Sequence, residues 1–214
     1  MQRYLVTGTD TDIGKTRITA SLAKALLDAG QPPTIVKLVQ TGLRPGEPGD
    51  ASRAGRLTGC RYVELARFTK AADPWSAALA EGMPTVRAED LRNALNDMAR
   101  AVVAEGAGGL AVPLNRTQNF GTVAFLARLR VVLAIGLRLG CMNHALLTLA
   151  LCEQLGLELA GAVLVDRFEV SEQSYVDDVR RALQGKIEIL GILPFEPDES
   201  ASVAAGARLF APLL

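Results

Sequence analysis

The sequence has few metal-binding residues of the kind that zinc sites use. Its three cysteines, Cys60, Cys141 and Cys152, are widely spaced without a CxxC pair, and the 214 residues include one histidine. Because a structural zinc site takes four such ligands, this composition argues against zinc. The cysteines are expected to be reduced thiols in a cytoplasmic protein.

The sequence also lacks an excess of charge and any long apolar run. Its 23 basic residues are balanced by 23 acidic ones, which leaves no electrostatic signature for nucleic acid or anionic lipid. The longest apolar run, residues 131–137, is too short to span a bilayer. Because a strand is predicted as early as residues 3–7, we expect no signal peptide before the fold. We therefore expect small-molecule partners, and neither nucleic acid nor membrane.

Strand-like and helix-like segments alternate along the chain. Strands are expected at residues 3–7, 34–39, 102–105, 130–137, 159–166 and 187–193, and helices at residues 15–27, 50–58, 88–99, 119–129, 143–155 and 171–183. The later strands are almost wholly apolar, as in parallel sheets covered on both faces. The pattern predicts an α/β fold with a doubly wound, mostly parallel sheet, helices on both faces, and a single catalytic domain over residues 1–214.

The segment GTDTDIGKT, from Gly8 to Thr16, follows the first predicted strand and opens the first predicted helix. In this context the segment predicts a P-loop, whose backbone N–H groups and helix start bind phosphate. Lys15 is expected at the terminal phosphates of a nucleotide, and Thr16 on Mg²⁺. A chance Gly-Lys-Thr in an ordinary turn is the weaker interpretation. The expected nucleotide contacts here are Gly8, Thr9, Asp10, Asp12, Ile13, Gly14, Lys15 and Thr16.

Two acidic residues, Asp10 and Asp12, make this P-loop unusual. The loop also has five residues between Gly8 and Gly14, one more than the common pattern. A carboxylate beside a triphosphate repels it unless a cation lies between them. Two sources of that cation are open: solvent or a neighbouring lysine, and an amine of the substrate.

Glu105 ends the strand at residues 102–105, directly before the glycine-rich segment GAGG. A carboxylate at the carboxyl end of a strand in a P-loop fold faces the metal, and Mg²⁺ offsets the cost of burying it. The alternative is a glutamate that caps a helix or forms a salt bridge.

Four segments together resemble the dethiobiotin synthetase family. They are VTGTDTDIGKT at residues 6–16, KLVQTG at 37–42, EGAGG at 105–109 with Pro113 and Leu114, and LGCMNHA at 139–145. All occur in the family's order. The resemblance implies a ligase that uses ATP and Mg²⁺ to join CO₂ to the two amines of 7,8-diaminononanoate, which closes the ureido ring of dethiobiotin.

The resemblance also implies roles for individual residues. Lys37 corresponds to the lysine that stabilises the carbamate, with a surface lysine at a strand end as the alternative. Thr41 corresponds to a hydroxyl near the diamine, and Thr11 to a P-loop contact with the substrate. Asp12 is the candidate acceptor for the ammonium groups. With Lys15, these residues form the expected catalytic set.

Further residues carry over to the metal, the nucleotide and the dimer. Thr16, Asp50 and Glu105 correspond to the magnesium site. The alternatives for Asp50 are that it only caps the helix at residues 50–58 and that it does both. Additional nucleotide contacts are expected from Glu105, Gly108, Pro194 and Phe195. Cys141, Met142 and Asn143 lie at a predicted helix start, which in the family receives the substrate carboxylate from the neighbouring subunit, so a homodimer is implied.

The chain departs from the family pattern at three places. Asp73-Pro-Trp-Ser76 replaces a common Ser-Pro-His, and Trp75 either shapes the wall against the aliphatic chain or belongs to the core. Leu38 stands where proline is usual. Val165 precedes Asp166 where many members have the asparagine that reads adenine, so nucleotides other than ATP are also candidates.

Three other functions compete with the ligase. An amidotransferase-type synthetase for cobyrinate-like acids needs a glutaminase domain, for which the chain has no room. A ParA/MinD-like ATPase carries a signature lysine early in the P-loop, where this chain has Asp10. Such an ATPase also needs a basic or amphipathic tail, which this sequence lacks. A catalytically degenerate nucleotide-binding regulator stays open because of the departures.

Overall fold

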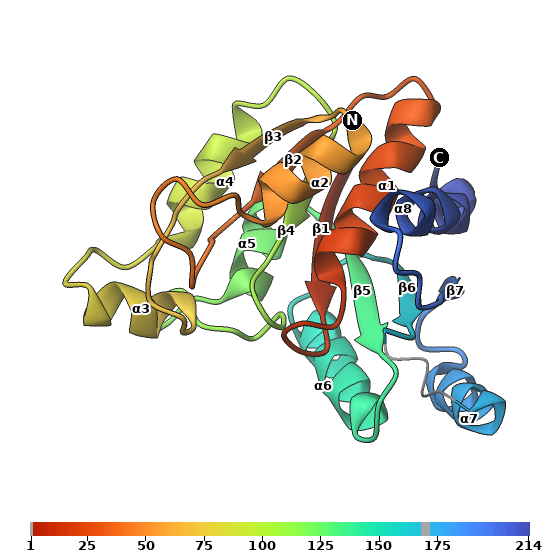
Figure 1. The fold of residues 1–214 in the computed structure, drawn as a ribbon. Coiled ribbons are helices and arrows are strands. Elements are labelled where there is room, and N and C mark those ends of the chain that lie inside the picture. The colour runs from red at the N-terminus through yellow and green to blue at the C-terminus, as the bar shows by residue number, and fades with distance from the viewer. Residues whose placement is uncertain (1, 168–171) are drawn as a thin grey trace.

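The computed structural model describes residues 2–167 and 172–214. Its strands are β1 (Arg3–Gly8), β2 (Thr34–Lys37), β3 (Arg61–Glu64), β4 (Val102–Glu105), β5 (Arg130–Gly136), β6 (Leu159–Val165) and β7 (Ile189–Leu193). Its helices are α1 (Lys15–Asp28), α2 (Asp50–Thr58), α3 (Pro74–Ala80), α4 (Ala88–Asn96), α5 (Phe120–Ala127), α6 (Cys141–Gln154), α7 (Gln173–Leu183), α8 (Glu199–Ala207) and the 3₁₀ helix η1 (Arg208–Leu213). Figure 1 shows their arrangement.

The strands form one sheet in the order β3-β2-β4-β1-β5-β6-β7, and every pair of neighbours is parallel. The chain first builds the sheet on one side of β1 and then, from β5 on, on the other. The direction of winding therefore reverses beside β1, and ligands bind at such a switch point, outside the carboxyl ends of the strands. The predicted doubly wound, parallel α/β fold is confirmed.

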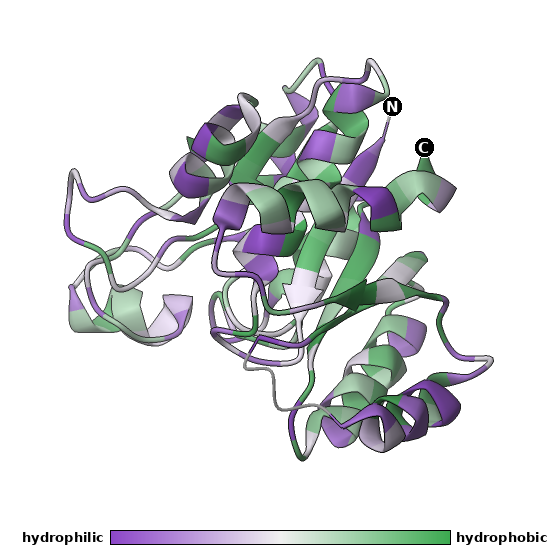
Figure 2. Ribbon diagram, turned by 45° about the vertical axis from the view of Figure 1, so that its right-hand side comes forward, coloured by the Kyte–Doolittle hydropathy of each residue, from purple (hydrophilic) through white to green (hydrophobic). Residues whose placement is uncertain are grey.

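Helices cover both faces of the sheet. In β1, Tyr4 and Val6 pack into a core shared with α1, α2 and η1, whereas Leu5 between them packs into a second core with α4 and α5. A third core lies under α6 and α7. Because neighbouring strand residues point to opposite faces, both faces of a strand must be apolar. Figure 2 shows the resulting concentration of hydrophobic residues in the central strands.

All the predicted strands and helices are present, with ends shifted by a few residues. The helix predicted from residue 171 begins, within the described residues, at Gln173, and residue 171 lies outside them. The structure adds β3, α3, α8 and η1. β3 is an edge strand whose Arg61 and Tyr62 are exposed, so it has no apolar run by which it could have been found. Within the described ranges, no helix is long and apolar enough to cross a bilayer.

Candidate active site

A cavity of about 470 Å³ opens at the carboxyl ends of the strands that flank the switch point. Its walls come from the segments that follow β1, β2, β4, β6 and β7, together with one side of α2. Twelve of the residues predicted from the sequence line it: Thr11, Asp12, Gly14, Lys15, Thr16, Lys37, Thr41, Asp50, Glu105, Gly108, Pro194 and Phe195. The fold thus brings residues that are far apart in the sequence into one site.

The P-loop connects β1 to α1 by a tight turn. Gly14 has a φ of 101° and precedes the first residue of α1, a conformation that favours glycine. Of the predicted nucleotide contacts in this loop, Gly8, Thr9 and Ile13 lie outside the cavity lining, as does Asp10. A Cβ on Gly8 would come within 2.8 Å of Ile13 Cδ1, and the Thr9 hydroxyl accepts a hydrogen bond of 3.3 Å from the Gly136 N–H. Gly8, Thr9 and Ile13 therefore form contacts within the loop and with the end of β5.

Lys15 is the buried cation of the P-loop. Its side chain is 7% exposed, and its Nζ donates to the carbonyl oxygen of Asp10 at 2.6 Å. Burial lowers the pKa of Lys15 to about 8, with the nearby charge of Lys37 adding to the effect and Glu105 opposing it. An anion bound beside Lys15 would stabilise its charged form, as expected for a phosphate contact.

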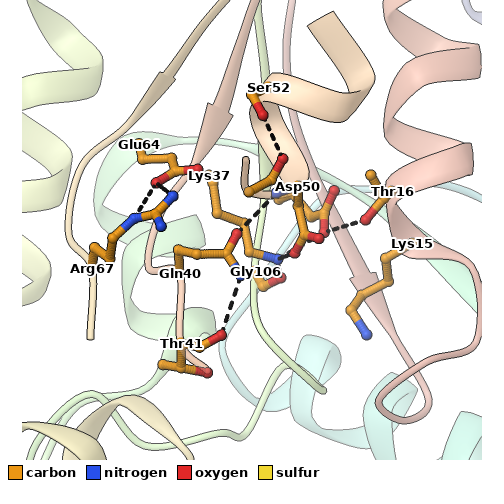
Figure 3. Close-up of polar contacts among 12 residues, drawn as sticks. Lys15, Thr16, Lys37, Gln40, Thr41, Asp50, Ser52, Glu64, Arg67 and Gly106 are labelled. Carbon is orange, nitrogen blue, oxygen red and sulfur yellow. Dashed lines mark hydrogen bonds and ion pairs between the residues drawn. The ribbon is translucent and has the colours of Figure 1, made fainter. Parts of the chain in front are cut away.

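Lys37 lies at the centre of a buried ion-pair cluster (Figure 3). Its Nζ is 2.5 Å from Asp50 Oδ2 and 2.7 Å from Glu105 Oε1, and it donates to the Gly106 carbonyl oxygen at 3.0 Å. The side chain is 3% exposed, so the alternative of a surface lysine is wrong. Burial disfavours the charge, but the two carboxylates outweigh it and hold the pKa of Lys37 above its usual value.

The two carboxylates of this cluster have different origins. Glu105 ends β4 and forms an ion pair with Lys37. The salt bridge that was the alternative prediction for this glutamate is therefore present. Asp50 is the first residue of α2, whose N-cap is Gly49 with no capping hydrogen bond from a side chain. The interpretation of Asp50 as a helix cap is therefore wrong, because its carboxylate points to Lys37 instead (Figure 3).

The same cluster contains oxygen atoms that could bind a metal ion. Thr16 Oγ1 donates to Glu105 Oε1 at 3.1 Å, while Glu105 Oε2 is buried and has no hydrogen-bond partner within the described part of the chain. A buried oxygen without a partner is costly. Among the described residues, no group of three or more His, Cys, Asp or Glu side chains could hold a metal alone. A hydroxyl and two carboxylates fit Mg²⁺, which keeps waters and substrate phosphates as its other ligands.

The acidic P-loop residues have arginine partners. Asp10 pairs with Arg138, which follows β5. Asp12 accepts a hydrogen bond at its carbonyl oxygen from Arg167, which follows β6, and the Arg167 Nη1 is 3.9 Å from Asp12 Oδ1. Within the described residues, the cation that pairs with each of these aspartates is therefore an arginine and not a lysine. The Asp12 side chain is 89% exposed, which leaves it open to an additional cationic group.

Gln40 is a residue of the site that the sequence interpretation missed. Its Oε1 accepts from the Asp50 N–H at 3.0 Å and its Nε2 donates to the Thr41 carbonyl oxygen at 3.3 Å. It thus joins Thr41 to the start of α2 (Figure 3). The sequence signal for Gln40 is its position in the segment KLVQTG, between Lys37 and Thr41, which were both predicted as site residues. The other lining residues are Arg17, Leu43, Arg53, Leu57, Ala107, Arg167, Leu193 and, at the position expected beside the base, Val165.

Three predicted substrate residues do not line the cavity of their own chain: Cys141, Met142 and Asn143. They form the first turn of α6, which begins at Cys141 and not near Asn143, because Gly140 turns the chain with a φ of 93°. Cys141 is buried and Asn143 is exposed. The Cys141 N–H donates a hydrogen bond of 3.0 Å to the Arg138 carbonyl oxygen.

The departures from the family pattern lie in different environments. Leu38 is fully buried, and Val165 is 4% exposed on the cavity wall. Trp75 is half-buried and lines a second, shallower cavity of about 410 Å³ with residues of the loop at 115–118. It lies outside the fully buried core, so its interpretation as a core residue is wrong, while a contact with the aliphatic chain stays a prediction.

Comparison with known proteins identifies similar sequences over almost the whole chain. A family model described as an AAA domain matches residues 2–202. The ATP-dependent dethiobiotin synthetase BioD of Rhodococcus jostii is 39% identical over 97% of this chain and 92% of its own length. The BioD proteins of Anaeromyxobacter sp. (strain K) and Ralstonia nicotianae are 35% and 37% identical, covering 100% and 98% of this chain and 97% and 96% of their own lengths.

Solved structures share the fold at low sequence identity. A plasmid partition protein from Borrelia burgdorferi has a TM-score of 0.66 at 10% identity, with all of both chains covered. A chain of the MinC:MinD cell division protein complex from Aquifex aeolicus has a TM-score of 0.60 at 14% identity, covering 100% of this chain and 89% of that one. At such identities the likeness extends to the fold alone.

Proposed function

Because this chain belongs to the family of ATP-dependent dethiobiotin synthetases, we propose that it carboxylates 7,8-diaminononanoate with CO₂ and closes the ureido ring of dethiobiotin. The observation that carries this proposal is the buried cluster of Lys37, Asp50 and Glu105 beside the P-loop. Such a cluster combines a fixed cation for a carbamate with acidic ligands for a metal at the phosphates.

The chemistry proceeds in three steps. One amine of the substrate attacks CO₂ and loses a proton, which gives a carbamate. The carbamate oxygen attacks the terminal phosphorus of ATP, which forms a carbamoyl-phosphate anhydride and releases ADP. The second amine then attacks the carbonyl carbon of the anhydride, expels phosphate and loses a proton, which closes the five-membered ring.

The chain's own residues supply charge and position for these steps. Lys15 would neutralise the terminal phosphates. Lys37 would stabilise the charge that develops on a carbamate oxygen, the kind of preorganised contact that accelerates group transfer most. The exposed Asp12 carboxylate is the acceptor for an ammonium of the diamine. Thr11 and Thr41 offer hydroxyls on the same wall.

Magnesium completes this assignment. Thr16, Asp50 and Glu105 would hold the ion, with the unpartnered Glu105 Oε2 as the first available ligand. When bound, Mg²⁺ supplies charge neutralisation between the phosphates during transfer.

We further propose one catalytic domain over residues 1–214 that acts as a homodimer in the cytoplasm. Leu139 and Leu147 are 94% and 62% exposed at α6, and such apolar exposure favours a protein partner. A twofold dimer through this region would bring the α6 start of one subunit to the other subunit's cavity, where its N–H groups suit the substrate carboxylate. The free cysteines fit a reducing compartment.

Release of phosphate tests the proposed activity. Purified protein with ATP, Mg²⁺ and bicarbonate should release phosphate only when the diamine is added. Release that is independent of the diamine would favour a plain ATPase, and no release at all would favour a degenerate regulator.

A further inference from the structure

One side of α2 forms part of the cavity wall. Asp50, Arg53 and Leu57 all line it, and spacings of three and four residues place them on the same helix face. Along this face a carboxylate of the magnesium cluster is followed by a guanidinium and then by an apolar side chain. Arg53 therefore lies between the proposed metal site and the apolar part of the wall.

The cavity lining carries five cationic side chains and three anionic ones. The cations are Lys15, Arg17, Lys37, Arg53 and Arg167, and the anions are Asp12, Asp50 and Glu105, an excess of two positive charges. Lys37 pairs with the buried Glu105 and the partly exposed Asp50, and Arg167 contacts Asp12. Arg17 and Arg53 differ from these two, because their ion-pair partner is Glu199, which does not line the cavity.

The pair between Arg53 and Glu199 is bidentate and accessible. Arg53 Nε donates to Glu199 Oε2 at 3.1 Å, and Arg53 Nη2 contacts Glu199 Oε1. Their side chains are 58% and 29% exposed. Exposed ion pairs contribute little to stability, so Arg53 can exchange this carboxylate for another anion at small cost.

The loop before α8 has a separate anchor. Arg17, 3.7 Å from Glu199 Oε1, also donates to the Glu196 carbonyl oxygen at 2.6 Å and to the buried Ser202 hydroxyl at 3.3 Å. Both α2 and α8 lie beside α1 on the same face of the sheet (Figure 1). Loss of the Glu199 charge would therefore leave the loop attached through Arg17.

We propose that Arg53 is a further nucleotide-binding residue that contacts the phosphate groups, and that Glu199 competes with the nucleotide for it. The inference rests on the proposed function, because it takes a nucleoside triphosphate as the ligand of the cavity. A guanidinium matches phosphate through two parallel hydrogen bonds as well as it matches a carboxylate. Its contact is independent of the base.

The test is equilibrium binding of ATP with Mg²⁺, without the diamine, to the full-length chain. Arg53→Gln should weaken ATP binding about tenfold, the scale of one hydrogen bond between charged groups. Glu199→Gln should tighten it, since it removes the competing anion. Arg56→Gln is the matched control, because Arg56 is exposed on the same helix and does not line the cavity; it should bind as wild type does.

Each outcome bears on a separate part of the inference. Arg53→Gln binding like Arg56→Gln would remove Arg53 from the nucleotide site. Unchanged or weaker binding by Glu199→Gln would show that Glu199 supports Arg53 and does not compete. Wild-type protein that fails to bind ATP would count against the proposed function itself. Thermal denaturation of each variant identifies any that is unfolded.

Discussion

Replacement of Lys37 by glutamine removes the cation from the buried cluster and leaves two carboxylates facing each other. Breaking a buried ion pair costs about 3–5 kcal/mol of stability, and the partial exposure of Asp50, 34%, places this variant at the lower end. Loss of a preorganised charge at the reacting oxygen should lower kcat by about a hundredfold to a thousandfold. ATP affinity should change little, because Lys37 ends β2 and is not part of the P-loop.

The assay is the rate of dethiobiotin formation at saturating ATP and diamine, together with the melting temperature. Lys24→Gln is the control, because Lys24 pairs with Asp28 on the exposed side of α1 and should have a normal rate. The pKa of Lys37 lies above its usual value of 10.5, so its stabilising charge is present below that pH and is lost only as the pH rises through the folded-state pKa. A kcat near that of the control would remove Lys37 from the mechanism.

Three further predictions concern the nucleotide and the dimer. Since burial lowers the pKa of Lys15 to about 8, ATP affinity should be constant below that pH and fall above it. Calorimetry of ATP binding against pH measures this, and an affinity that stays constant well above pH 8 would contradict the role of Lys15 as a phosphate contact. Mixing inactive Lys15→Ala and Asn143→Ala proteins should restore part of the activity through hybrid dimers, and a fully active monomer in the ultracentrifuge would exclude this. The Val165 side chain can neither donate nor accept a hydrogen bond, so the kcat/KM values with CTP, GTP and UTP should lie within about tenfold of the value with ATP. A preference for ATP above about a thousandfold would show that backbone groups read adenine.

The sequence predicted those parts of the site that a single segment specifies. The glycines and Lys15 of the P-loop stand next to one another in the chain, and the carboxylate of Glu105 marks the end of an apolar strand. Their position at one edge of the sheet follows from parallel strand order alone. The lining of the cavity by Lys37 and Asp50 also agrees with the family resemblance.

The missed contacts join segments that only the three-dimensional fold brings together. Arg138 and Arg167 follow β5 and β6 and meet the P-loop aspartates, but a charged residue in a loop gives no sign of its partner. Arg53 is one of two arginines on the helix predicted at residues 50–58, and the sequence does not show which of them faces the cavity. α6 begins at Cys141, two residues before the predicted start, because Gly140 turns the chain in the left-handed conformation.

The central claim is the joining of CO₂ to a diamine at the expense of ATP. Mass spectrometry of a reaction that contains diaminononanoate, carbon-13 bicarbonate, Mg²⁺ and ATP tests it most directly. The account predicts dethiobiotin that carries one carbon-13 atom per molecule, with ADP and phosphate formed in equal amounts. ATP consumption without incorporation of the labelled carbon would contradict it.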